Sequence, residues 1–154
     1  MRLLWAAMVL APLFCQTVVL SVQCTRSENS VDVSVSLESA ADLRLTALQW
    51  ELIAPAQLQT TAWSSEPGGA PKADGKSLHC ASHAGDQPGV TKQVCVLVGG
   101  QKPLASGQVA KFHFPIPKGT KPGRYKIEIR HARGVTHNLK EVAISGTSDE
   151  LTVP

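Results

Sequence analysis

The residue types best suited to chemistry lie together in the segment 79-HCASH-83, with another cysteine at Cys95. Two histidines and two cysteines form a donor set that zinc accepts. Neither cysteine, however, belongs to the C-x-x-C pair that is typical of a structural zinc site. Cys80 and Cys95 flank one loop between two expected strands, so we predict a disulfide between them and no metal site.

Hydrolytic chemistry has no motif of its own in the sequence. The patterns G-x-S-x-G and H-E-x-x-H are absent. Asp32, Glu38 and Glu51 alternate with apolar residues, which places them on the outward faces of strands rather than across a cleft. Cys24 is the cysteine left over, and without a neighbouring base it is expected to be a buried or half-buried apolar residue. We predict no catalytic residue, no cofactor and no enzyme activity.

Tryptophan side chains can act as platforms for sugar rings, and Trp50 and Trp63 are the two candidates for this role in the predicted strands and loops. Trp50 shares one face of its strand with Leu48 and Leu52, while polar residues take the other face. We therefore predict that Trp50 lies in the core. Trp63 stands beside Ser64 at the start of a Pro/Gly-rich stretch, so it is the candidate exposed ring and the candidate carbohydrate contact.

The elements that must position these residues are short strands. Alternation of apolar and polar residues dominates from Thr17 onward and recurs over 17–23, 31–38, 45–53, 77–82, 93–99, 108–116, 124–131, 139–145 and 150–153. Clusters of turn-forming residues separate many of these segments, and the longest cluster, 64–76, is expected to be an inter-strand loop. Eight or nine strands with regular turns predict an all-β antiparallel sandwich.

The N-terminal segment has a different character. The chain opens with MRLLWAAMVLAPLFCQ, in which Arg2 precedes an apolar run that is too short to span a bilayer comfortably. This pattern is typical of a secretory signal peptide. We predict a signal peptide over 1–15, a single domain over 16–154, and no membrane span after cleavage. The expected location is secreted, extracellular or at the cell surface, with the periplasm as an alternative.

Charge is unevenly distributed. The chain has 15 Lys and Arg residues against 12 Asp and Glu residues, and the stretch 102–140 contains nine of the basic residues but only Glu128 as an acid. Such a bias indicates either a solvated strand face or a basic face for an acidic partner. The candidate partner-binding face consists of Lys111, His113, Lys126 and Arg130. Nucleic acid is not an expected partner, since the predicted export removes it and interleaved exposed aromatics are lacking.

The order of the strands resembles that of a cohesin domain, within the superfamily of cohesins and carbohydrate-binding modules. The segments that carry the resemblance are 31-VDVSVSLE-38, 47-ALQWEL-52, 106-SGQVAKFHFPIP-117, 119-GTKPGRYKIEI-129 and 141-EVAISGTSDELTVP-154. More narrowly, 75-GKSLHC-80 with 93-QVCVLVGG-100 is similar to secreted single-domain cohesin-like proteins of bacteria, in which this cysteine pair recurs. The resemblance covers roughly residues 17–154.

The resemblance implies a jelly-roll sandwich that binds a protein on one sheet face, in a setting of polysaccharide degradation or of the cell surface. The implied partner is a dockerin-like or surface protein. Two alternatives stay open: a carbohydrate-binding module, and a structural cell-surface protein without a ligand. An exposed cluster of aromatic side chains would favour carbohydrate, whereas a sheet face that is both apolar and charged would favour a protein partner.

Overall fold

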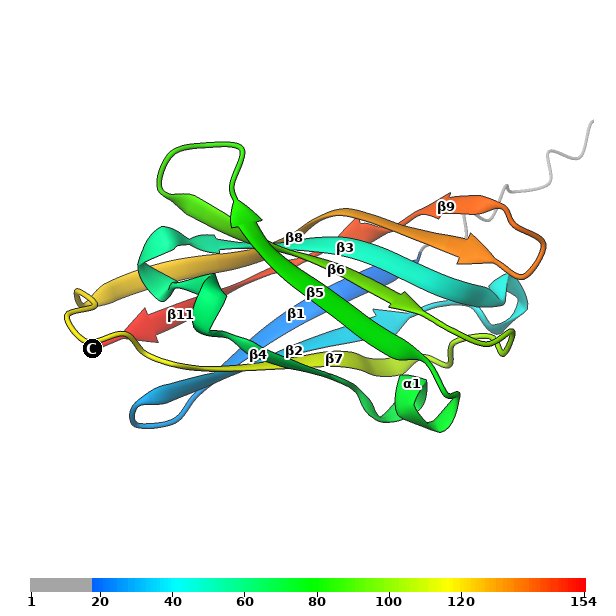
Figure 1. Ribbon diagram of the computed structural model, residues 1–154, viewed down its shortest axis with the longest axis horizontal. Helices are drawn as coiled ribbons and strands as arrows, with labels where there is room; N and C mark the ends of the chain where they lie inside the picture. The colour runs from blue at the N-terminus through cyan, green and yellow to red at the C-terminus, as the bar shows by residue number, and fades with distance from the viewer. Residues whose placement is uncertain (1–17) are drawn as a thin grey trace, which may run out of the picture.

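The computed structural model describes residues 18–154, and the predicted signal peptide over 1–15 lies outside the described residues. The described chain forms a β-sandwich with eleven strands (Figure 1). The strands are β1 (Val19–Arg26), β2 (Ser30–Glu38), β3 (Leu45–Pro55), β4 (Ser64–Pro67), β5 (Ser77–Ala84), β6 (Val90–Val98), β7 (Gly107–Pro115), β8 (Gly123–Thr136), β9 (Glu141–Ala143), β10 (Ser145–Gly146) and β11 (Ser148–Val153). Helical structure is limited to α1 (Gly69–Ala73) and three 3₁₀ turns, Ala41–Leu43, Ala56–Leu58 and Thr60–Ala62.

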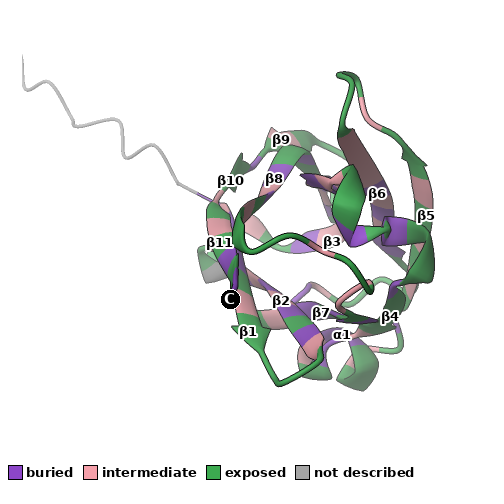
Figure 2. Ribbon diagram, turned by 90° about the vertical axis from the view of Figure 1, so that its left-hand side faces the viewer, coloured by how far each residue is buried: buried purple, intermediate pink, exposed green. Residues whose placement is uncertain are grey.

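The strands form two sheets that pack face to face. The first sheet, sheet A, has the order β10-β1-β2-β7-β4, and the second, sheet B, has the order β11-β8-β3-β6-β5, with β9 also paired to β8. Pairing is antiparallel except between β1 and β10, which is parallel. Figure 2 shows the two layers from one end, with β2 and β7 below and β3 and β6 above.

The core lies between the sheets and follows the alternation of the sequence. In β2 the four residues Val31, Val33, Val35 and Leu37 are buried, and each is followed by a polar residue. This is the pattern of a strand with one face toward a core and the other toward water. Trp50, in the middle of β3, is fully buried, so its predicted core position is confirmed.

One side of the sandwich is closed by the C-terminal strands. The chain pairs with β1 through β10 and then crosses to sheet B, where β11 pairs with β8. Gly146 sits at this crossing, where a Cβ atom would lie 2.3 Å from the carbonyl oxygen of Ile129. Only a residue without a side chain fits so close an approach of two backbones.

The stretch 64–76 differs from the predicted loop. It contains β4, an edge strand that pairs with β7, and the short helix α1. Pro67, the two following glycines and Pro71 gave a strong turn signal, but backbone pairing to β7 outweighs it. Within residues 18–154 no helix is long and apolar enough to cross a membrane.

Candidate functional site

The outer face of sheet B combines apolar and charged side chains. Val94, Val96 and Val98 of β6 alternate with the inward residues Cys95 and Leu97, so the three valines form a ridge on the outside. Val94 and Val96 are half-buried, and Val98 has 36% of its surface exposed. We call these three valines the valine ridge. Exposed apolar ridges of this kind are typical of surfaces that bind other proteins.

Residues of the neighbouring strands lie beside the valine ridge on the same face. Ala81 of β5 pairs with Val94, and Gln49 of β3 pairs with Val96. Ile53, further along β3, is also half-buried on this face. We use the term docking face for the valine ridge together with these three residues. It also includes the linked side chains of Lys92, Asp86, Glu51 and His131, which are described next.

A row of linked polar side chains, which includes the ion pairs of Lys92, crosses the docking face beside the valine ridge. Lys92 of β6 contacts Asp86 and Glu51 with nitrogen to oxygen distances of 3.2 Å in each case. The other carboxylate oxygen of Glu51 lies 2.9 Å from Nδ1 of His131 on β8. Glu51 thus links three strands, and its side chain is only 16% exposed.

His131 owes its position to an irregularity in β8. The register between β3 and β8 shifts between Gln49 and Glu51, and His131 has a positive φ of 50°. A bulge of this kind places two consecutive residues, Arg130 and His131, on the exposed side of the strand. Such bulges are common next to functional sites, where they re-aim a side chain.

A second ion-pair group lies closer to the N-terminal end of β8. Glu128 contacts Nζ of Lys126 at 2.9 Å and also pairs with the guanidinium of Arg130. Hydrogen bonds from Arg130 and Lys126 hold the pKa of Glu128 below its usual value, against the opposing effect of burial. These side chains line a hollow of about 200 Å³ together with Ile53 and Val90.

We expect the protein to lose stability as the pH falls below 4.5, the usual value for a glutamate. Partial burial acts to raise the pKa of Glu51, but hydrogen bonds from His131 and Lys92 outweigh it and lower the pKa. A carboxyl with a lowered pKa in the folded state stabilises the fold above the unfolded-state pKa, and this contribution disappears as the pH falls through the folded-state pKa. The same reasoning applies to Glu128.

Thermal unfolding followed from neutral to acidic pH measures this contribution. The variants Glu51→Gln and Glu128→Gln should each show a smaller decrease of the unfolding midpoint on acidification than the parent protein. Glu150→Gln, at an exposed pair with Arg124, is the matched control. Equal acid sensitivity in all three variants and the parent would show that these two carboxylates do not carry the effect.

The outer face of sheet A is mostly polar, with Val19 and Pro115 as its apolar residues. Its outward residues on β1 and β2 include Ser21, Gln23, Asp32 and Ser36. The described strands of this face therefore carry no ridge of consecutive outward apolar residues like the one on the docking face.

The four predicted basic residues do not share a face, so that prediction is wrong as stated. Lys111 and His113 lie on β7 in sheet A, whereas Lys126 and Arg130 lie on β8 in sheet B. The outward sides of the two sheets point away from each other. All four side chains also lie close to carboxylates: Lys111 is 3.8 Å from Glu66, and His113 is 2.7 Å from Asp32.

Trp63 is buried, so its predicted exposure is wrong, and the ring offers little free surface for the predicted carbohydrate contact. Only 8% of its surface is exposed. Its ring stacks on Phe114 with a centroid distance of 4.1 Å and meets Phe112 edge-on at 6.2 Å. The indole Nε1 donates to the carbonyl of Leu58 at 2.9 Å. The 3₁₀ turns before Trp63 fold the chain back over the core and direct the ring inward.

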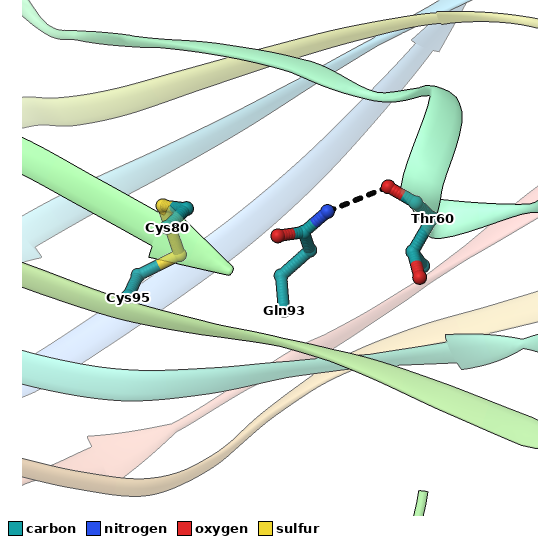
Figure 3. The surroundings of a disulfide bond; sticks show 4 residues. All are labelled: Thr60, Cys80, Gln93 and Cys95. Carbon is teal, nitrogen blue, oxygen red and sulfur yellow. Dashed lines mark hydrogen bonds between the residues drawn. A yellow bond between two sulfur atoms is a disulfide. The ribbon is translucent and has the colours of Figure 1, made fainter. Parts of the chain in front are cut away.

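Cys80 and Cys95 form the predicted disulfide (Figure 3). They face each other directly in the β5–β6 pair, with Cα atoms 4.2 Å apart. Nearby on β6, the buried amide of Gln93 donates to the carbonyl of Thr60 at 2.6 Å, as Figure 3 shows. No group of three or more metal-ligating side chains occurs between residues 18 and 154.

Cys24 is a half-buried free cysteine, as predicted. Burial and, to a lesser degree, the nearby charge of Asp149 raise the pKa of its thiol to about 12. The thiol is therefore protonated at neutral pH and a poor nucleophile.

The valine ridge was not predicted from the sequence, although the sequence contains a signal for it. The run 94-VCVLV-98 is apolar on both faces of its strand, unlike 31-VDVSVSLE-38, which is polar on one face. In a sheet with one solvent-facing side, an apolar run on both faces predicts an exposed apolar surface.

The fold matches cohesin domains of known structure, while neither models of protein families nor curated protein sequences match the chain. One similar structure is the OlpA cohesin of Clostridium thermocellum, solved in a type I complex with the dockerin Doc918. It has a TM-score of 0.66 and 12% sequence identity over 88% of this chain and 98% of that chain. Another is the sixth cohesin of scaffoldin B from Acetivibrio cellulolyticus, in complex with a Cel5 dockerin mutant. It has a TM-score of 0.61 and 14% sequence identity over 90% of this chain and 99% of that chain.

A cohesin module from a Clostridium perfringens family 33 glycoside hydrolase also matches, with a TM-score of 0.60 and 12% identity over 88% of this chain and 97% of that chain. The chain therefore has the fold of a cohesin domain. The predicted all-β sandwich is confirmed.

Proposed function

We propose that the protein is a non-catalytic module that binds another protein on the docking face. The observation that carries the proposal is the contrast between the two outer faces of the sandwich. One face is mostly polar, and the other presents the valine ridge beside the linked side chains of Lys92, Glu51 and His131. An apolar centre with a charged surround is the usual composition of a protein interface.

The similar structures support this proposal and indicate a class of partner. Two of the cohesins described above were solved in complexes with dockerins. A dockerin-like protein is therefore the first partner to test. The burial of Trp63 removes the one exposed ring considered for carbohydrate, so sugar binding has no comparable support.

The partner is expected among secreted proteins. The apolar N-terminal run and the Cys80–Cys95 disulfide are both typical of proteins that work outside the cytoplasm. Retention of partners from the cytosolic fraction alone would contradict this location.

The test is a binding assay with the oxidised protein against secreted proteins of its source and a panel of dockerins. Val96→Asp should weaken binding about thirtyfold, because it places a charge in the centre of the valine ridge. Lys126→Glu, on the same side of the sandwich, should weaken binding of an acidic partner about fivefold.

Lys111→Glu is the matched control for Lys126→Glu. Both lysines are exposed and lie near a glutamate, but Lys111 is on the opposite sheet. It should leave the affinity unchanged. Binding that is insensitive to Val96→Asp but weakened by Lys111→Glu would move the interface to sheet A and overturn the proposal.

A further inference from the structure

The strand β5 has an unusual free edge. It is eight residues long and pairs only with β6, so one side of its backbone has no neighbouring strand. The other sheet edges within residues 18–154 are protected. On the β1–β11 side, the backbone N–H groups of Val22 and Cys24 donate to side chains of Thr147 and Asp149. The edge strand β4 has only four residues and ends at Pro67.

Two observations identify the backbone groups on the free edge of β5. The Cα atoms of Cys80 and Cys95 are 4.2 Å apart, a spacing typical of a pair that exchanges no backbone hydrogen bonds. In the same register, the N–H of Gly85 donates to the carbonyl of Val90 at 3.0 Å. Odd-numbered residues of β5 therefore direct their backbone groups toward β6. The N–H and C=O groups of Leu78, Cys80, Ser82 and Ala84 point away from it.

This edge lacks the sequence features that usually prevent strand pairing. Natural edge strands carry lysine or proline, contain a bulge, or are very short. The sequence of β5, SLHCASHA, contains neither proline nor any Lys, Arg, Asp or Glu, and its register with β6 runs without a shift. The disulfide further holds β5 on β6, so an added strand would meet a fixed template.

We propose that β5 pairs in antiparallel fashion with β5 of a second copy of this chain. In one register all four free residues are used: Leu78 pairs with Ala84 of the second copy, and Cys80 pairs with Ser82 of the second copy. Ala81 then lies on the two-fold axis, where its small side chain permits close approach. Two symmetric copies form a closed assembly in this way.

Side-chain chemistry favours a second copy as the occupant. On the outer face of the joined sheet, His79 would stand opposite His83 of the second copy, and no Lys, Arg, Asp or Glu of β5 would face a like charge. A strand without permanently charged side chains does not repel its own copy, whereas like charges directly opposite each other do. The inference does not depend on partner binding at the docking face: the two surfaces share Ala81, but the strand pairing uses the outward backbone groups of β5.

The decisive variant is Ser82→Pro, with Ser82→Ala as its matched control. Both remove the hydroxyl that contacts Thr60 at 2.6 Å, but only proline removes the outward N–H. That N–H would be used twice in the symmetric pair, so self-association should weaken about tenfold or more in Ser82→Pro. Ser82→Ala should associate like the parent. Sedimentation velocity over a concentration series gives the dissociation constants for self-association, and circular dichroism shows whether each variant is folded.

A second pair of variants keeps the backbone intact. Ala81→Lys would place like charges opposite each other on the axis and weaken association by up to about fivefold. Ser21→Lys adds the same charge on the exposed face of β1 and should have no effect. In the parent, amide exchange at Leu78, Cys80, Ser82 and Ala84 should slow as concentration rises, while His79 and Ala81 stay unchanged.

Three results would overturn the proposal. The first is a monomer at every concentration, and the second is a dimer that Ser82→Pro and Ala81→Lys leave intact. The third is a monomer whose four β5 amides become protected only when a separate protein partner is added, because the edge would then receive a strand from that partner.

Discussion

Replacing Trp50 with alanine is expected to lower the free energy of unfolding by about 3–5 kcal/mol. Trp50 is fully buried and lies on β3, between β6 and β8 in sheet B. It is first among the largest fully buried side chains of the described core, so truncation leaves a large cavity. Urea unfolding followed by circular dichroism measures the loss. A cost below about 1 kcal/mol would show that the ring is not in the core.

Trp50→Phe and Trp63→Phe separate ring volume from hydrogen bonding. The Nε1 group of Trp50 has no hydrogen-bond partner among the described residues, whereas that of Trp63 donates to Leu58. Phenylalanine at position 50 loses ring volume but no hydrogen bond. At position 63 it also leaves a carbonyl unpaired, which costs about 1 kcal/mol more. An equal cost at both positions would argue against this assignment of partners.

Which residues face inward could be predicted from the sequence wherever alternation was regular. In β2 and β3 the period of two placed Val33, Trp50 and Leu52 in the core, and all three are buried. A strand has only two faces, and the core must take the apolar one. Local sequence therefore contains enough information for this decision.

Which sheet each strand joins could not be predicted in the same way. Lys111 and Lys126 both alternate with apolar residues, and both point outward, but they belong to different sheets. Sheet membership depends on pairing between distant segments, such as β2 with β7 and β3 with β8. A single sequence carries little local signal for such long-range pairing, so residues grouped by charge were placed on one face in error.

Trp63 was mispredicted for a related reason. Serines and a Pro/Gly-rich stretch follow it, and these are signals of an exposed loop. Its burial depends on the pairing of β4 with β7, which brings it against Phe112 and Phe114. A large aromatic ring in a chain with few others can bury much apolar area, and this gain outweighs the local turn preference.

Reducing the Cys80–Cys95 disulfide is expected to lower the free energy of unfolding by about 3 kcal/mol. The two cysteines are 15 residues apart, and the bond limits the conformations of that loop in the unfolded chain. Urea unfolding with and without dithiothreitol compares the same side chains in two oxidation states. Faster amide exchange should appear in β5, because the bond holds this edge strand on β6.

The double variant Cys80→Ser/Cys95→Ser distinguishes this bond from other effects of the reductant. It should unfold like the reduced parent, and dithiothreitol should not change it, because Cys24 is a free thiol. Cys24→Ser should keep the full response to the reductant. Equal stability of the oxidised and reduced parent would mean that the β5–β6 pairing and the surrounding core hold the edge strand without the covalent link.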